Sequence, residues 1–522
     1  MASALLRLEP PNDGSSAVKQ MPRSASILQE IGMFCLLALG FGLCLYFVST
    51  TLVGLGILSD INVNFGARAM LAYDGAPPKL ENIGGIYPPI PFFLVLVFRD
   101  ALLAAAIAGG AVLAAALVFI GTLHRQGHIG AGVKWMYVIS ILALPQMLYV
   151  LTQRIDLCLT LCSFILTMWS IRVAEIHGKT YHLIICGLSM AFLYLCDTTT
   201  MLICLLFFPF IARRGHQTHN SIIAVLVVTF LPLLFFAGVQ RPMSLLITGI
   251  EDPFFQWTSL LRVSQNIASP EARPGDGHLA DAALVIGHHL ADNWLLLAPW
   301  FAAWGVVIMR GGIRLLGENF KYLAAPLLYS WYSIYQGTGI FESSSSALLI
   351  FPSMGLLVTG QQIFSSGNYP RRGNTVMTLA MVLALVGGWH SMKHSLNLDE
   401  QRFHKAVFEQ QHTDHWADFM NILSLLGGQG EKGLILMDTE RNLPLVYFSG
   451  NPQRFLLPYQ LDYEIGCSLP ASYVEYVVVY GDPRYDGVLR KHPTLLQDAL
   501  PGFECIATIG KRLVFKRVDT TR

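Results

Sequence analysis

Residues 59–91 read SDINVNFGARAMLAYDGAPPKLENIGGIYPPIP and lie between two long apolar segments, 31–58 and 93–121. Asp60 comes directly after the first of these segments. Residues 62–74 have the pattern of an amphipathic helix of roughly three turns. Because a carboxylate at a bilayer surface is costly unless it is paired or functional, this stretch predicts a candidate active site at the end of a membrane span. The alternative is an Asp that only caps a helix at the interface.

Composition sets the class of protein. Of 522 residues, 53% are hydrophobic and 13% are charged, whereas soluble domains carry about 25% charged residues. The sequence therefore predicts a polytopic membrane protein. A net charge of +1 with no basic block gives no indication of a nucleic-acid partner, and we expect none. The nine cysteines have no metal-binding spacing, and Cys467 and Cys505 can pair if the C-terminal tail is extracytoplasmic.

Apolar runs long enough to enter a membrane recur along the chain. We expect eleven spans, at 31–58, 93–121, 132–151, 156–173, 182–196, 199–212, 221–239, 294–310, 322–336, 346–364 and 375–391. The basic residues of the short loops fall on one face, which the positive-inside rule makes cytoplasmic. Residues 1–30 are then cytoplasmic, and the outer loops 59–92 and 240–293 share the other side with the tail. This predicts a multi-pass protein of a bacterial inner membrane with its C-terminal domain in the periplasm.

The tail, residues 392–522, has the pattern of a small α/β domain. A polar helix pattern near 398–427 precedes short apolar runs separated by turn signals such as Gly450-Asn451-Pro452. These runs lie at 433–438, 444–449, 474–480, 503–508 and 513–517. Asp414, His415 and Asp418 are its only group resembling a catalytic constellation. Their spacing favours a solvated helix face, so we expect the tail to recognise an acceptor or partner and not to perform chemistry.

A second carboxylate, Asp156, lies in the tight outer turn 152–156 between the third and fourth spans. It is expected at the same membrane depth as Asp60. Arg154, two residues before it, has two open roles. It either holds an anionic phosphate or pairs with Asp156 and closes the hairpin.

Taken together, these motifs resemble the membrane-integral glycosyltransferases of the GT-C fold, which include protein O-mannosyltransferases and the lipid A aminoarabinose transferase. The features that carry the resemblance are Asp60, the helix pattern 62–74, the turn Gly75–Pro78, the re-entry Tyr87-Pro88-Pro89 and Asp156. It is convincing over about 59–175. Relatives often have two acidic residues in the first motif, whereas Ile61 and Asn62 follow Asp60 here. Some carry a Lys after the fifth or sixth span, where this chain has Cys196-Asp197-Thr198.

The resemblance implies a GT-C-like membrane domain over 31–391 and an enzyme that transfers a sugar from a polyprenyl-phosphate carrier, with inversion. The acceptor is a lipid, glycan or protein at the outer membrane face. Asp60 and Asp156 are the expected catalytic residues. A divalent metal is an option that the resemblance leaves open, and we assign no metal ligand. The expected substrate-binding residues are Arg68, Tyr87, Arg154, Arg241 and Glu342.

Two other functions fit parts of the sequence. A transporter or lipid flippase is the first, but the chain has no detectable repeated halves, which many transporters have. A non-catalytic membrane subunit that binds a partner through its outer domain is the second, because a fold alone does not establish activity. Substitution of Asp60 and Asp156 by Asn separates an enzyme from a scaffold.

Overall fold

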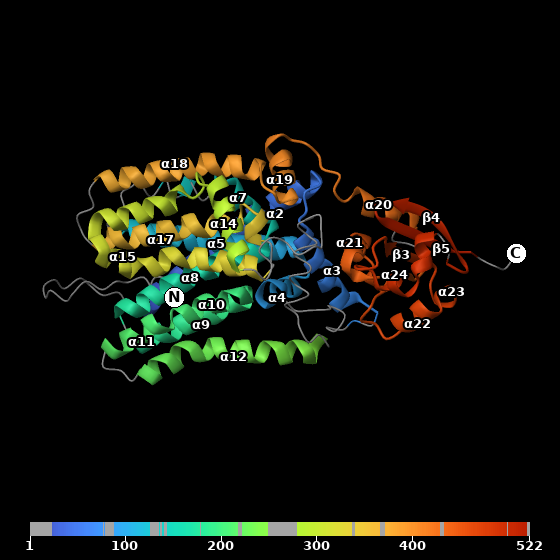
Figure 1. Ribbon diagram of the computed structural model, residues 1–522, viewed down its shortest axis with the longest axis horizontal. Coiled ribbons are helices and arrows are strands. Elements are labelled where there is room, and N and C mark those ends of the chain that lie inside the picture. The colour runs from blue at the N-terminus through green and yellow to red at the C-terminus, as the bar shows by residue number, and fades with distance from the viewer. Residues whose placement is uncertain are drawn as a thin grey trace. The chain divides into compact units, whose positions relative to one another are not determined.

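The computed structural model describes most of the chain and divides it into two compact units (Figure 1). One unit comprises residues 1–52, 102–237 and 268–410, and the other comprises 53–101, 238–267 and 411–522. We call them the helical unit and the mixed unit. The described residues are 23–76, 78, 88–125, 135, 138–139, 143–177, 179–217, 222–248, 279–336, 340–365, 371–427, 433–497 and 500–518.

Long apolar helices build the helical unit, as the composition predicts. Five helices among the described residues are long and apolar enough to cross a membrane: Gly32–Gly54, Ala101–Val118, Ile155–Glu175, Ile222–Val239 and Thr375–Lys393. The helices of the unit, some of which continue into the other unit, are α2 (Arg23–Gly54), α5 (Ala101–Arg125), α7 (Pro145–Gln153), α8 (Ile155–His177), α9 (Thr180–Cys196), η2 (Thr198–Thr200), α10 (Met201–Leu206), α11 (Phe208–Gln217), α12 (Ile222–Thr248), α14 (Leu279–Asp292), α15 (Ala298–Tyr335), α16 (Ile340–Ser343), η3 (Ala347–Leu349), α17 (Ile350–Ser365), α18 (Arg371–Lys393) and α19 (Leu398–Phe408).

Helix α15 contains two of the expected spans, 294–310 and 322–336, and it folds back on itself. The indole Nε1 of Trp300 donates to the carbonyl oxygen of Leu323 at 3.0 Å, and the rings of Trp304 and Phe320 are 5.8 Å apart. A straight helix would separate residues 23 positions apart by about 34 Å at 1.5 Å per residue. The two halves therefore lie side by side, as expected of two successive spans.

The number of spans remains a prediction. Besides the five long helices, the described part of the chain contains four shorter apolar helices, at Pro89–Phe98, Thr180–Cys196, Ala298–Met309 and Ala347–Thr359. The expected fifth and sixth spans correspond to α9 and to the short helices α10 and α11, with a break at Asp197. Of the expected third span, 132–151, most residues before 143 lie outside the described residues, and α7 forms its end.

The mixed unit contains a five-stranded sheet in the order β2-β1-β3-β5-β4, drawn in orange to red in Figure 1. Strand β1 pairs in parallel with β2 and β3, and β5 pairs antiparallel with β3 and β4. Buried apolar side chains such as Leu436, Val477 and Phe515 form its core. The elements of the unit are α3 (Asp60–Asp74), α4 (Pro89–Phe98), α20 (Ala417–Leu425), β1 (Ile435–Met437), α21 (Thr439–Ser449), η5 (Pro452–Arg454), β2 (Phe455–Leu456), α22 (Tyr463–Ser468), α23 (Pro470–Tyr473), β3 (Tyr476–Tyr480), α24 (Gly487–Lys491), η6 (Pro493–Gln497), β4 (Phe503–Ile509) and β5 (Arg512–Arg517).

The tail differs from the sequence interpretation in its boundary and in one element. Residues 392–410, including α19, group with the helical unit, whereas 53–101 group with 411–522. The apolar run 444–449 belongs to α21, because Asp438 caps that helix by accepting from the amide of Glu440. Cys467 and Cys505 are both free thiols.

Sidedness can be tested at two exposed positions. Leu461 in the mixed unit is 89% exposed, and Lys179 before α9 is also exposed. We expect an impermeant maleimide added to intact cells to label Leu461→Cys but not Lys179→Cys, because the basic loops mark the cytoplasmic face. Permeabilised cells should label both. Labelling of Lys179→Cys in intact cells would contradict the proposed orientation.

Candidate active site

Asp60 is the first residue of α3, where the sequence places the end of the first span. The side chain of Ser59 caps the helix by accepting from the amide of Asn62 at 3.2 Å. A carboxylate in the first helical turn is stabilised by the positive end of the helix dipole. The helix ends at Gly75, whose amide donates to the carbonyl of Leu71. Asp60 is thus held at a fixed helix terminus within the mixed unit.

A segment 355 residues away in the sequence completes this terminus. Thr413 donates through its amide to the carbonyl of Leu55 at 3.1 Å and through its hydroxyl to that of Gly56 at 3.1 Å. Three residues later, the indole of Trp416 donates to the carbonyl of Leu58 at 3.2 Å. Gly56 has φ +82°, and a Cβ there would lie 2.0 Å from the carbonyl oxygen of Thr413. The close approach therefore requires glycine.

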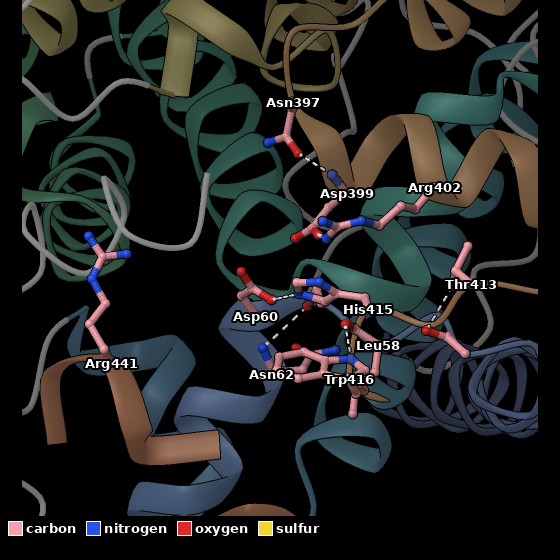
Figure 2. Close-up of polar contacts among 12 residues, drawn as sticks. Leu58, Asp60, Asn62, Asn397, Asp399, Arg402, Thr413, His415, Trp416 and Arg441 are labelled. Atoms are coloured by element: carbon pink, nitrogen blue, oxygen red, sulfur yellow. Dashed lines mark hydrogen bonds and ion pairs between the residues drawn. The ribbon is translucent and has the colours of Figure 1, made fainter. Parts of the chain in front are cut away.

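These contacts bring His415 to Asp60. The imidazole Nε2 of His415 lies 2.9 Å from Oδ1 of Asp60, as Figure 2 shows. Both side chains are mostly covered, with 18% and 17% of their surfaces exposed. The expectation that His415 belongs to a solvated helix face is wrong. Asp414 does remain 84% exposed and pairs with His412 instead.

Two further features of α3 matter for the site. Asn62 is buried, and both atoms of its side-chain amide lack a hydrogen-bond partner among the described residues. This amide therefore has unused hydrogen-bonding capacity two residues after Asp60. Gly66 allows α3 to approach α21, because a Cβ there would lie 2.4 Å from the ring of Tyr447.

Arg68, an expected substrate-binding residue, lies on α3 beside Tyr459. Burial lowers the pKa of its guanidinium to about 10, and Tyr459 partly opposes this change. Arg68 therefore has a neighbour from the C-terminal part of the chain. Tyr87 lies outside the described residues. Arg241 and Glu342 fall in α12 and α16, but their side chains are outside the described part of the structure.

Arg154 and Asp156 form a buried bidentate ion pair in the helical unit. Arg154 lies between α7 and α8, and Asp156 is in the first turn of α8. The guanidinium Nε and Nη2 donate to Oδ1 and Oδ2 of Asp156 at 2.9 and 2.7 Å. Only 2% of Arg154 and 4% of Asp156 are exposed. Of the two roles considered for Arg154, pairing with Asp156 is the one observed. Asp60 and Asp156 belong to different units, so their expected convergence within about 10 Å stays a prediction.

Asp197 has two interpretations from the sequence: it faces the same cavity as Asp60 and Asp156, or it caps the short sixth span. The structure shows the capping role. Its Oδ1 accepts from the amide and hydroxyl of Thr199 at 2.9 and 2.7 Å, and its Oδ2 accepts from the hydroxyl of Tyr329. The Asp-Thr-Thr sequence thus starts the short helix η2, which is the simpler of its two interpretations.

The serine run after Glu342 binds a buried carboxylate of the protein itself. Glu400, in the first turn of α19, is fully buried. It accepts from the Ser345 amide and hydroxyl at 3.0 and 2.7 Å and from the Ser346 amide at 2.9 Å. The hydroxyls of Ser344 and Ser395 complete its shell. The hydroxyls of Ser344 and Ser345 are therefore engaged within the helical unit.

We expect Glu400→Gln to lower the free energy of unfolding by about 1–3 kcal/mol, because the amide nitrogen would face hydroxyl and amide donors and leave them unpaired. Detergent-solubilised protein unfolded by SDS titration measures this loss. Glu409→Gln, an exposed position just after the same helix, is the matched control and should have little effect. Equal stabilities for the two variants would show that the serine shell contributes nothing.

Comparison with known proteins gives two structural neighbours of this chain. No protein-family model and no curated protein matches the sequence. Arabinofuranosyltransferase AftD from Mycobacteria is similar over 91% of this chain at 14% identity and a TM-score of 0.42, and the match spans only 41% of AftD. ArnT from Cupriavidus metallidurans in the apo state is similar over 95% of this chain and 98% of its own, at 12% identity and a TM-score of 0.36.

Proposed function

We propose that this protein is a membrane glycosyltransferase that moves a sugar from a polyprenyl-phosphate carrier to an acceptor, with Asp60 and His415 at its active site. The observation that carries the proposal is the contact between these two side chains at the start of α3. A carboxylate and an imidazole from distant segments, held by glycine and backbone contacts, form the kind of pair that performs general base catalysis.

In the proposed reaction, an acceptor hydroxyl attacks the anomeric carbon of the lipid-linked sugar. A new bond from the acceptor oxygen to this carbon forms as the bond from the carbon to the phosphate oxygen breaks. The phosphate leaves with the electron pair, and the configuration inverts. Asp60 Oδ2 takes the proton of the hydroxyl, while the imidazole N–H of His415 donates to Oδ1 and fixes the carboxylate.

The leaving phosphate needs cationic stabilisation. Arg154 already forms a bidentate ion pair with Asp156, so we do not assign it to the phosphate. We propose instead that the pair is a positioning element of the helical unit and that Asp156 helps to orient the acceptor. A divalent cation is a second option for the Asp60 and His415 side chains, since a carboxylate oxygen and an imidazole nitrogen are common metal ligands. Such an ion would take the place of the hydrogen bond between them. When bound, such an ion would supply charge stabilisation of the phosphate.

The same proposal places the mixed unit outside the membrane. Its expected partners are a polyprenyl-phosphate-linked sugar, membrane lipids and a lipid, glycan or protein acceptor. The inner membrane and periplasm of a bacterium are the proposed location. Turnover that depends on Asp60 would exclude a flippase and a non-catalytic subunit, since neither needs a general base.

His415 provides the test of the proposed site. We expect His415→Gln to lower the rate of sugar transfer by about 10- to 100-fold, because the charged carboxylate of Asp60 loses the hydrogen bond that the imidazole N–H donates to it. The readout is the consumption of lipid-linked sugar by membranes that contain equal amounts of each variant. Asp414→Ala, the exposed neighbour, should keep full activity. Full activity in His415→Gln would show that His415 is not part of the active site. The tail would then have a role in recognition only.

A further inference from the structure

A group of arginine and aromatic side chains lies at the carboxyl end of β3 in the mixed unit. We call it the arginine–tyrosine cluster. Its members come from four elements and the loop after β3. They are Phe419, Arg441, Tyr480, Tyr485 and Arg512.

Aromatic rings hold both guanidinium groups in place. Arg441, in the first turn of α21, lies 4.4 Å from the ring centroid of Tyr485 and 5.6 Å from that of Tyr480. Arg512, at the start of β5, lies 4.0 Å from the ring of Phe419 and also 5.6 Å from that of Tyr480. Both arginines and both tyrosines are half-buried. The two cations thus share Tyr480 and remain reachable from solvent.

Neither arginine has an ion-pair partner within the described part of the chain. Arg512 donates to two neutral acceptors, the side-chain oxygen of Asn442 at 3.1 Å and the carbonyl of Arg441 at 3.0 Å. Arg441 donates no hydrogen bond to a described residue, and its Nε is buried without a partner. By contrast, the neighbouring Arg484 makes a bidentate pair with Asp482, at 3.1 and 2.8 Å.

Two adjacent, half-buried cations without a counter-ion are unfavourable unless something balances them. Burial lowers the pKa of Arg512 to about 10; Tyr480 and Asp418 oppose this change, and the charge of Arg441 adds to it. Two carboxylates act on the cluster from outside ion-pair distance: Asp418 on Arg512 and Glu440 on Arg441. Among the described residues, neither acid forms an ion pair with these arginines, so the guanidinium donors stay open to an added anion. The unused donors of Arg441 are those of a planar fork, which suits a tetrahedral oxyanion.

We propose that the arginine–tyrosine cluster binds a phosphate group, with Arg441 as the main donor and Arg512 as the second charge. The group belongs either to a soluble phosphate compound or to the headgroup of an anionic lipid. The site is separate from the Asp60–His415 pair, and its existence does not depend on the proposed transfer reaction. If transfer does occur, α21 links the two, since Tyr447 of this helix packs on Gly66 of α3.

Thermal unfolding of the full-length protein tests the proposal. Protein in a neutral detergent is titrated with inorganic phosphate at constant ionic strength. Protein in nanodiscs of phosphatidylcholine alone is compared with protein in nanodiscs that also contain phosphatidylglycerol. We expect one of these anions to raise the unfolding midpoint. In Arg441→Gln, about ten times more anion should be needed for the same rise in the unfolding midpoint, because the substitution removes charge-assisted hydrogen bonds.

Arg441 makes no hydrogen bond to the described residues, so Arg441→Gln should fold, and Arg441→Lys serves as a second variant that keeps the charge without the planar fork. Arg484→Gln is the matched control and should respond like the wild type, because Arg484 is already paired. A response to inorganic phosphate identifies a soluble ligand, and a response only to phosphatidylglycerol identifies a lipid headgroup. No response in the wild type, or equal responses in wild type and Arg441→Gln, would overturn the proposal.

Discussion

Replacement of Asp60 by Asn is expected to reduce sugar transfer by about 10²- to 10⁴-fold, the contribution typical of a general base. Asn keeps the size of the side chain and can still accept from His415 through its oxygen, but it cannot take a proton. The fold should remain intact, because Asp60 is part-exposed and Ser59 supplies the N-cap of α3. The measurement is turnover of lipid-linked sugar by purified protein, with circular dichroism as the check on folding.

Asp74→Asn is the matched control for this experiment. Asp74 ends the same helix, is exposed and lies at the opposite terminus from His415. It should leave turnover unchanged. A folded Asp60→Asn variant with the turnover of the Asp74→Asn variant would mean that Asp60 is not the base.

Replacement of Asp156 by Asn should have the largest effect on stability, lowering the free energy of unfolding by about 3–5 kcal/mol. The change leaves the guanidinium of Arg154, which is 2% exposed, without its counter-charge. Unfolding in mixed detergent micelles measures the loss. Any drop in activity must then be normalised to the folded fraction before a catalytic role is assigned to Asp156.

The chain contains a matched exposed pair for comparison. Asp482 and Arg484 are also two residues apart and bidentate, but Arg484 is 63% exposed. Asp482→Asn should therefore cost at most about 1 kcal/mol, as for other surface ion pairs. If Asp156→Asn and Asp482→Asn lowered the free energy of unfolding equally, burial would not make the Arg154–Asp156 pair more important for stability than an exposed pair.

Local patterns in the sequence were enough to predict parts of the fold. The helix that starts at Asp60 follows from its cap and its amphipathic spacing, and the apolar runs gave the long helices. The run 444–449 was harder, because a short apolar run does not distinguish a strand from a buried helix. Its helical state depends on the Asp438 cap. The boundary near residue 410 depends on contacts between distant segments, which no local pattern contains.

For the site residues too, those that depend on local sequence patterns were found, and the one that depends on contacts between distant segments was missed. Asp60 was visible because a carboxylate beside a span is unusual, and the pairing of Arg154 with Asp156 was one of two local interpretations. His415 was assigned to a solvated face, because its contact with Asp60 requires residues 55–58 and 413–416 to meet. Its neighbour Trp416 was the available signal, since tryptophan is highly buried on average and here is 8% exposed.

The most direct test of the central claim is the mass of the cell-envelope glycans in cells that lack this protein, complemented with the wild type or with Asp60→Asn. The proposed function predicts that deletion removes the mass of a sugar from an envelope glycan, lipid or protein. It also predicts that the wild type restores that mass and that Asp60→Asn, present at the same level in the membrane, does not. Restoration by Asp60→Asn, or an envelope unchanged by deletion, would contradict a transferase that acts through Asp60.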